Sequence, residues 1–194
     1  IEFFQGHILD QNFLGKNLYD ADIIHHLAGV TDVAYVKTDS NPELDEKIRS
    51  IALDGTNNIL KSIPKKCKII FPSTHVIFEG FNVIKKNITE EESPKPVLMY
   101  SRSKVQNEND IRNSKRDYVI LRLGSVYGYS FDTMRINIMP NLFSKIASQN
   151  GKINLFGGGV QFKSLVSVID VVRCLKFMGE RDDINNEIFH LTNE

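Results

Sequence analysis

The chain has 194 residues, which is enough for one domain with a substantial hydrophobic core. Its 24 Lys and Arg balance 24 Asp and Glu, so the charge gives no support for nucleic acid or an anionic membrane as a partner. No apolar run is long enough to span a bilayer and no signal peptide opens the sequence, so we expect a cytoplasmic protein.

The first half of the chain predicts strands that alternate with a helix. Residues 1–4 are apolar and strand-like, and residues 22–28 form a short apolar run typical of a buried parallel strand. A proline opens a helix that we expect over residues 42–62. Residues 68–73 predict a second buried strand, which leads directly to Thr74.

The second half continues the alternation. A polar loop precedes a helix that begins near Val97, and residues 117–123 predict a third buried strand. The elements expected after it are a helix at 138–149, a glycine-rich turn at 157–159, a strand at 165–168, a helix at 170–178 and a strand at 188–191. Such alternation predicts an α/β fold, a doubly wound parallel sheet with helices on both faces.

Small and polar residues follow several predicted strands. Ala28 and Gly29, then Thr74, then Gly124 and Ser125 all fall at strand ends. In parallel sheets the carboxyl ends of the strands share one edge, and ligands bind there. This convergence is the strongest physical indication of a site.

Tyr100 and Lys104 add chemistry to that edge. Their i, i+4 spacing puts both on one helix face. A phenol has a reference pKa of about 10, and a neighbouring ammonium favours the phenolate, as general acid–base catalysis requires. Taken singly, such a pair also suits a surface helix, and Thr74 also suits a simple turn cap.

Histidine and cysteine spacing indicates no metal site. His25 and His26 are adjacent, so on a strand they point to opposite faces. His75 follows Thr74 and could contact a substrate, with a structural hydrogen bond as the alternative. The two cysteines lie far apart, and we expect each to be a small buried apolar residue in a reducing compartment: Cys67 and Cys174.

The motifs occur in a recognisable order. H-L-A-G, G-T-N-N-I-L, P-S-T-H-V-I-F-E-G, Y-S-R-S-K, L-R-L-G-S-V-Y-G and V-S-V-I-D-V-V follow one another. In this the chain resembles the extended short-chain dehydrogenase/reductase family of NAD(P)-dependent nucleotide-sugar epimerases, dehydratases and reductases. The resemblance runs from Gly6 to the C-terminus. It implies a Rossmann-like fold, NAD or NADP as cofactor, a nucleotide-sugar substrate and a homodimer through the helix that carries Tyr100.

The resemblance also implies roles for individual residues. Tyr100 would be the catalytic acid/base, and Lys104 would hold the nicotinamide ribose while lowering the pKa of Tyr100. Thr74 would donate a hydrogen bond to the substrate oxygen at the reacting carbon. The cofactor would lie against two short segments, Leu27, Ala28 and Gly29 in H-L-A-G and Gly124, Ser125 and Val126 in L-G-S-V.

Substrate contacts are implied further along the chain. Ser125 belongs to the segment that, in the family, runs from the nicotinamide to the substrate, which His75 could also touch. Asn137 in N-I-M-P would contact the diphosphate, and Phe156 would line the nucleobase. Lys163 stands where the family often has a phosphate-binding arginine. Each of the last three has an alternative: Asn137 as a helix cap, Phe156 as a core residue and Lys163 as a solvated charge.

One family feature is absent from the sequence. The family begins with a strand and a glycine-rich turn that holds the cofactor pyrophosphate, and nothing here matches it. The chain therefore looks truncated by about two βα units, and we expect it to fold poorly and bind NAD poorly by itself. Residues 1–130 would be a partial NAD(P)-binding Rossmann domain. Residues 131–194 would be a small, partial substrate-binding region interleaved with the last Rossmann elements.

The reaction stays open between epimerase and reductase. A dehydratase is disfavoured because T-H-V replaces the acidic T-D-E of the family's 4,6-dehydratases. The F-E-G string resembles dTDP-4-dehydrorhamnose reductases, whereas N-I-M-P resembles epimerases. The alternative is a non-catalytic relative that binds a nucleotide or a protein; the missing turn favours it, and the retained trio of Thr74, Tyr100 and Lys104 disfavours it.

Overall fold

A parallel sheet is the centre of the molecule. The computed structural model describes residues 1–31, 41–81, 83–131, 134–160 and 162–193. The strands are β1 (Ile23–His25), β2 (Lys68–Thr74), β3 (Tyr118–Leu123) and β6 (Glu187–Leu191), hydrogen-bonded in the order β1-β2-β3-β6. All three pairings are parallel, which confirms the predicted α/β fold.

One face of the sheet is covered by the helices that precede β3. They are α1 (Gln11–Leu18), α2 (Pro42–Arg49), the π-helical η2 (Ser50–Asp54), α3 (Gly55–Ser62) and α4 (Met99–Asn113). Fully buried Phe71 and Ile120 of the sheet pack there with Ile111 of α4 and Ile59 of α3. This burial of apolar surface anchors the helices to the sheet.

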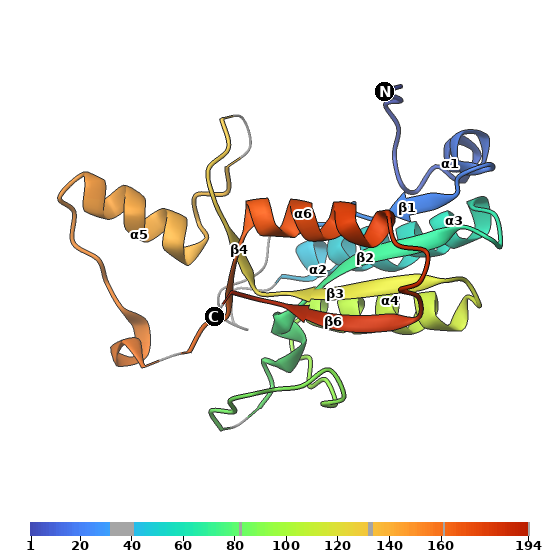
Figure 1. Ribbon diagram of the computed structural model, residues 1–194. Coiled ribbons are helices and arrows are strands. Elements are labelled where there is room, and N and C mark those ends of the chain that lie inside the picture. Colours follow the sequence, from blue (N-terminus) through green and yellow to red (C-terminus); the bar gives the residue numbers. More distant parts are fainter. Residues whose placement is uncertain (32–40, 82, 132–133, 161, 194) are drawn as a thin grey trace.

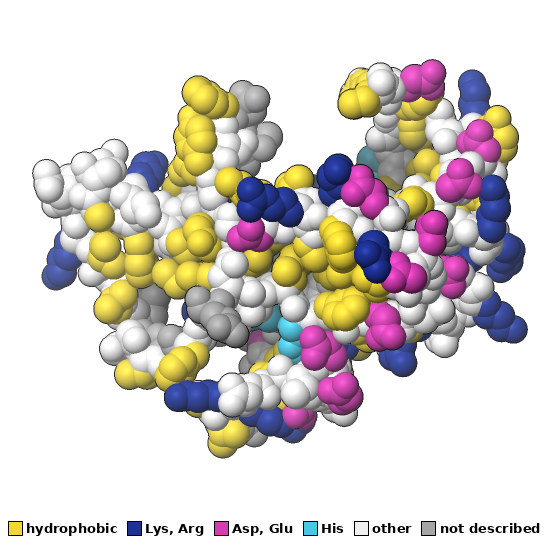
Figure 2. Space-filling model, in the orientation of Figure 1, with side chains coloured by type: hydrophobic (Ala, Val, Ile, Leu, Met, Phe, Trp, Pro, Cys, Tyr) yellow, Lys and Arg dark blue, Asp and Glu magenta, His cyan; other side chains and the backbone are white. Residues whose placement is uncertain are grey.

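The opposite face is covered by α6 (Val168–Gly179) (Figure 1). Met178 of this helix packs on Ile70, Val119 and Leu121 of the sheet. The outer side of α6 stays apolar, and Figure 2 shows hydrophobic side chains gathered over it; the exposed ones include Ile169, Val172 and Phe177. The sheet therefore lies between two helical layers, which is the doubly wound arrangement.

A second, smaller sheet continues from the first. It pairs β4 (Ser125–Tyr127) with β5 (Leu165–Ser167) in parallel. Between these strands lie α5 (Met139–Ser148) and a short 3₁₀ turn, η4 (Phe156–Gly159). Figure 1 shows α5 projecting away from the main sheet, and none of its residues is buried.

Most expected elements are confirmed, with shifts at their ends, but two expectations were wrong and one helix was not expected. Residues 1–4 form no strand and are exposed, since no neighbouring strand offers them a ladder of hydrogen bonds. The strand expected at 22–28 shrinks to β1, at the edge of the sheet, and Ile23 and His25 are exposed rather than buried. Helix α1 was not expected; Asp10 caps it, its Oδ1 accepting the Phe13 N–H at 2.9 Å.

Candidate active site

Two strand ends meet as the sequence predicted. Thr74, the last residue of β2, pairs in register with Leu123, the last residue of β3. Thr74 is buried, and its Oγ1 accepts the N–H of Val76 at 3.2 Å, capping the short helix η3 (His75–Phe78). Thr74 is therefore a helix cap, which was one of the two expected roles. Its hydroxyl also forms a hydrogen bond with Tyr100.

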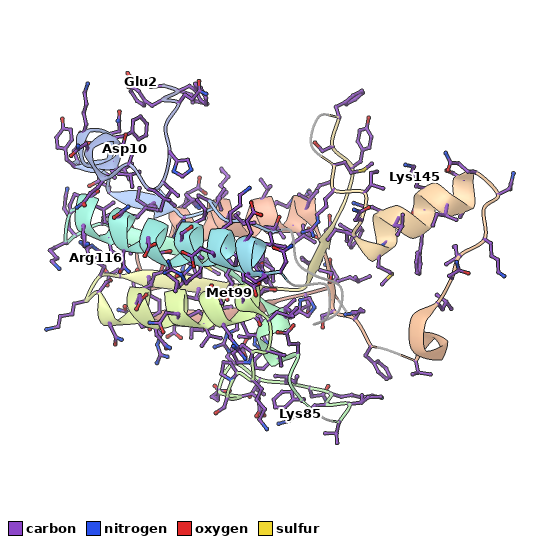
Figure 3. The ribbon with its side chains drawn as sticks, turned by 180° about the vertical axis from the view of Figure 1, so that it is seen from behind. Glu2, Asp10, Lys85, Met99, Arg116 and Lys145 are labelled. Carbon is purple, nitrogen blue, oxygen red and sulfur yellow. The ribbon has the colours of Figure 1, made fainter. Side chains whose placement is uncertain are left out.

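Tyr100 reaches this edge from the first turn of α4. Its phenol is largely buried, and burial raises the pKa of Tyr100. A hydrogen bond with Thr74 and the positive charge of Arg135 act in the opposite direction on that pKa. Figure 3 shows Met99, the first residue of α4, at the end of the helix beside the loop that carries Lys85.

Lys104 lies one turn further along α4. Its Nζ donates to the carbonyl oxygen of Pro72 at 2.7 Å and lies 4.4 Å from the centre of the Phe71 ring. Desolvation by burial lowers the pKa of Lys104 to about 8, while the charge of Glu108 raises it. The ammonium stays within 6.0 Å of the centre of the Tyr100 ring.

The expected effect of Lys104 on Tyr100 is not what the structure shows. We expected the ammonium to lower the pKa of the phenol, yet the net shift is upward. Burial outweighs the favourable contributions, and those come from Thr74 and Arg135. Lys104 directs its charge to the Pro72 carbonyl instead.

A buried ion pair between Glu108 and Arg122 lies one helical turn beyond Lys104. Both Glu108 oxygens accept from the guanidinium of Arg122 on β3. Ser73 of β2 also donates to Glu108, and Arg122 donates to the Glu90 carbonyl oxygen at 2.9 Å. Satisfied charges of this kind hold strands and helix in one arrangement.

The residues expected near the cofactor fall into two groups. Leu27, Ala28 and Gly29 follow β1 and are exposed, and no atom of the described residues would lie within 4 Å of a Cβ built on Gly29. Gly124, in contrast, is buried, and a Cβ there would lie 2.9 Å from the carbonyl oxygen of Ser164. Close packing of two chain segments therefore accounts for a glycine at position 124, whether or not a cofactor binds there.

Ser125 and Val126 are placed by the small second sheet. Both belong to β4 and are partly buried, and the Ser125 N–H donates to the Ser164 carbonyl oxygen at 2.8 Å. Their segment continues directly from the end of β3, which carries it past the edge where Thr74 lies. The expected contact of this segment with the cofactor stays a prediction.

The residues expected at the substrate are less closely gathered. His75 makes the structural hydrogen bond that was the alternative, from its Nδ1 to the Leu123 carbonyl oxygen at 3.0 Å. Burial lowers the pKa of His75, and the charge of Lys163 lowers it further. Asn137 lies one residue before Ile138, the N-cap of α5, so it does not occupy the cap position. Phe156 begins η4, and its side chain lies outside the described part of the structure.

Three residues of the site were not expected. Arg135 contributes charge to Tyr100, Glu108 holds Arg122 beside Lys104, and Glu79 accepts hydrogen bonds at the start of α4. The sequence carried a signal for two of them. Glu108 repeats the i, i+4 spacing beyond Lys104, and Glu79 belongs to the F-E-G string.

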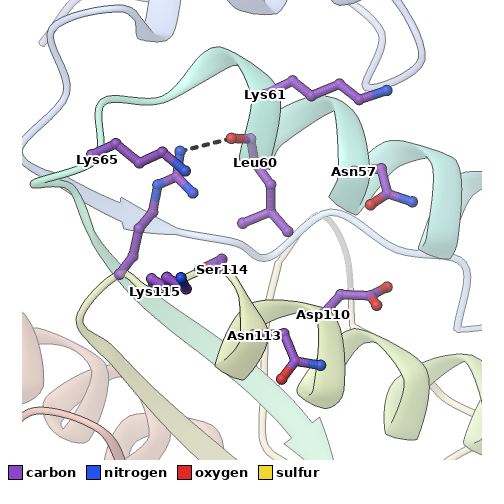
Figure 4. Close-up of a pocket in the computed structure, with 9 residues that line it drawn as sticks. Asn57, Leu60, Lys61, Lys65, Asp110, Asn113, Ser114 and Lys115 are labelled. Atoms are coloured by element: carbon purple, nitrogen blue, oxygen red, sulfur yellow. Dashed lines mark hydrogen bonds between the residues drawn. The ribbon is translucent and has the colours of Figure 1, made fainter.

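A pocket of about 480 Å³ lies at the opposite end of the body, between the ends of α3 and α4 (Figure 4). Lys61, Lys65 and Lys115 line it, and Arg116 is occupied in donating to the Leu60 carbonyl oxygen at 2.8 Å. Among the described residues no group of three or more His, Cys, Asp or Glu could hold a metal ion. None of the described helices is both long and apolar enough to cross a membrane.

The doubly wound parallel sheet, with a hydroxyl, a phenol and an ammonium gathered at one edge, defines a Rossmann-type α/β protein. Within that class, the model of the NAD dependent epimerase/dehydratase family matches residues 1–191. The chain belongs to this family.

Two curated relatives are similar in sequence. The probable low-salt glycan biosynthesis reductase Agl14 of Haloferax volcanii is 29% identical over 139 residues, which are 71% of this chain and 44% of the relative. The N-acetyl-alpha-D-glucosaminyl-diphospho-ditrans,octacis-undecaprenol 4-epimerase of Escherichia coli O157:H7 is 28% identical over 180 residues, 89% of this chain and 50% of the relative. The chain thus spans about half the length of the curated relatives it matches.

Solved structures share the fold. A UDP-glucose 4-epimerase of Thermotoga maritima, crystallised with UDP-glucose, has a TM-score of 0.81 at 23% identity, over 98% of this chain and 62% of that one. A UDP-glucuronic acid 4-epimerase of Bacillus cereus, crystallised with UDP-glucuronic acid and NAD, has a TM-score of 0.79 at 21% identity, over 100% of this chain and 60% of that one.

Proposed function

We propose that the protein is an NAD(P)-dependent epimerase or reductase that acts on a nucleotide-linked sugar. The observation that carries the proposal is the meeting of Thr74, Tyr100 and Lys104 at one sheet edge in a member of the epimerase/dehydratase family. The division into a cofactor part, residues 1–130, and a substrate part, residues 131–194, belongs to the same proposal.

The residues of the chain perform the proton transfer. NAD(P), when bound, supplies the hydride acceptor or donor. Tyr100 takes the proton of a sugar hydroxyl, or returns it to a carbonyl oxygen, and Thr74 donates a hydrogen bond at the same oxygen. Because burial raises the pKa of Tyr100, the reaction needs nearby positive charge to stabilise the phenolate.

The residues present fit one half of the cofactor. Lys104 is partly buried near Tyr100, where it would hold the nicotinamide ribose, and the described residues leave room beside Gly29 for a ligand to approach the backbone. The chain has no glycine-rich turn of the family type, so these residues offer no matching cradle for the pyrophosphate.

Two positive charges support an anionic substrate. Arg135 acts on Tyr100 and Lys163 acts on His75, and neither has a carboxylate partner in the described ion pairs. The two curated relatives described above are a probable glycan biosynthesis reductase and a 4-epimerase of a diphosphate-linked sugar. A sugar attached to a diphosphate would place its charge within reach of such cations.

The test is Tyr100→Phe in the full-length protein, with Tyr129→Phe, an exposed tyrosine, as the matched control. We expect NADH affinity to change by less than about twofold and turnover of UDP-glucose or UDP-glucuronic acid to fall by about a hundredfold or more in Tyr100→Phe alone. Nicotinamide fluorescence reports binding, and product analysis reports turnover. Full activity of Tyr100→Phe would overturn the mechanism.

The second candidate is a non-catalytic relative that binds a nucleotide or a protein. Such a relative would not need the glycine-rich turn that holds the cofactor pyrophosphate in the family, and residues 1–194 contain no such turn. The same fluorescence titration with NADH and NADPH separates the two. Binding of neither cofactor by the full-length protein would support the non-catalytic function.

A further inference from the structure

The helix that carries Tyr100 has no cap of its own. Its N-cap residue is Leu98, whose side chain cannot accept a hydrogen bond. A carboxylate from a distant segment takes this place: Glu79 Oε1 accepts the N–H of Val97 at 2.8 Å and the N–H of Leu98 at 2.7 Å. The hydroxyl of Ser101 donates to the same oxygen. The N–H of the N-cap residue Leu98 has no partner within the helix, so this acceptor satisfies it, together with the N–H of Val97 just before the helix. The negative charge of Glu79 also suits the helix dipole.

Glu79 is tied by its own backbone to the other half of the site. It directly follows η3, the short helix that Thr74 caps, and its N–H donates to the Val76 carbonyl oxygen at 3.0 Å. Only four residues therefore separate Thr74 from Glu79, whose carboxylate caps α4. Thr74, at the start of this segment, forms a hydrogen bond with Tyr100, and Glu79, at its end, contacts Leu98 and Ser101 on either side of Tyr100.

Two backbone hydrogen bonds lock the two segments together. The Gly80 N–H donates to the Lys95 carbonyl oxygen at 2.9 Å, and the Lys95 N–H donates to the Ile77 carbonyl oxygen at 2.8 Å. A Cβ on Gly80 would lie 2.4 Å from the Lys95 oxygen, so only glycine permits this approach. These hydrogen bonds hold the end of η3 directly against the segment before α4, although a long loop that includes residues 83–96 separates the two in sequence.

We propose that Glu79 is a positioning residue that holds Tyr100 of α4 at the hydroxyl of Thr74. The inference rests on the proposed function in one respect, that Tyr100 is the acid/base. Thr74 and Tyr100 come from different elements, and Glu79 is the side chain that joins the end of one to the start of the other. A misplacement of about 1 Å at a reacting group costs up to about a hundredfold in rate.

The experiment compares three variants of the full-length protein. Glu79→Ala removes the acceptor, Glu79→Gln keeps one carbonyl oxygen at the same position, and Glu91→Ala is the control, an exposed glutamate of the neighbouring loop. Hydrogen exchange of the Val97 and Leu98 amides reports the cap directly and needs no substrate. The ultraviolet titration of Tyr100, taken as the difference from Tyr100→Phe, reports the surroundings of the phenol.

We expect exchange at Val97 and Leu98 to speed up about tenfold in Glu79→Ala, the effect typical of a lost helix cap. In the same variant the titration of Tyr100 moves down toward that of a solvated phenol, because the side chain loses part of its burial. Turnover falls by about tenfold to a hundredfold with an unchanged KM for NADH. Glu79→Gln restores most of each property, and Glu91→Ala changes none.

Two outcomes would overturn the inference. If the amides of Val97 and Leu98 exchange at the same rate in Glu79→Ala as in Glu91→Ala, the carboxylate does not cap α4. Faster exchange with an unaltered Tyr100 titration would show a cap that does not position the phenol. A protein without turnover on nucleotide sugars would refute the proposed function alone, because the exchange and titration still decide the role of Glu79.

Discussion

The sheet body and the α5 segment are packed very differently. The sheet body, β1, β2, β3 and β6 with helices α1 to α4 and α6, contains two clusters of buried apolar side chains. The α5 segment, residues 134–160, contains no buried side chain within α5 and projects from the body (Figure 1). The buried Thr74 and the partly buried Lys104 belong to the first region, whereas Asn137 and Phe156 belong to the second.

Under the proposed function, this difference in packing would separate the catalytic residues from those that select the substrate. A group that transfers a proton must be held to within fractions of an ångström, which a packed core provides. A segment with little burial contributes little to folding stability and can vary more freely. We therefore expect changes in the sheet body to cost stability and changes in the α5 segment to alter which substrate is used.

The largest expected contrast is between two phenylalanines. Phe71→Ala should lower the free energy of unfolding by about 3–5 kcal/mol, because this fully buried ring packs between sheet and helices. Phe143→Ala in α5, where the ring is only partly buried, should cost about 1 kcal/mol or less. Urea unfolding measures both. Equal losses would remove the distinction between the two regions.

A second contrast concerns pH. Burial, aided by the charge of Lys104, lowers the pKa of His26 to about 4, and its Nε2 lies 2.8 Å from Thr56 Oγ1. The unfolded chain binds the proton at about 6.5, so stability is complete above that pH and is lost as the pH falls toward 4, by about 3 kcal/mol. His26→Gln should flatten this part of the stability curve, measured by urea unfolding at several pH values. An unchanged slope would contradict the buried neutral histidine.

Arg116 tests the far end of the body. It is buried, and it donates to the carbonyl oxygens of Leu60, in the last turn of α3, and of Ile63 and Pro64, just after α3. Arg116→Gln should cost about 1–3 kcal/mol, because buried carbonyl groups lose their donor. Lys115→Gln, its exposed neighbour, should leave the unfolding midpoint unchanged. A midpoint shift shared by both variants would indicate a general charge effect instead.

The smallest effect is expected on the outer surface of α6. Lys176 and Glu180 form an exposed ion pair with an Nζ–Oε1 distance of 2.9 Å. Glu180→Gln should change the free energy of unfolding by about 0.5 kcal/mol or less, and salt should remove the difference. A larger loss of unfolding free energy that does not depend on salt would mean that this surface of α6 is covered in the full-length protein.

Much of the body could be predicted because its signals are local. The runs around Ile70 and Ile120 are apolar over a whole strand, and such runs predict buried parallel strands wherever they occur. The proline at the start of α2 and the i, i+4 spacing of Tyr100 and Lys104 likewise act within one element. The structure adds one correction, since burial raises the pKa of Tyr100 where we expected Lys104 to lower it.

The sequence by itself determined the order of strands and helices and the chemical groups that end up at one sheet edge. The tertiary structure alone decided the capping of α4 by Glu79, the pairing of Glu108 with Arg122 and the exposure of β1. The reason is physical: periodicity and apolar runs report contacts within an element. A hydrogen bond across 18 or 19 residues depends on where two elements meet in space, and no local pattern encodes that.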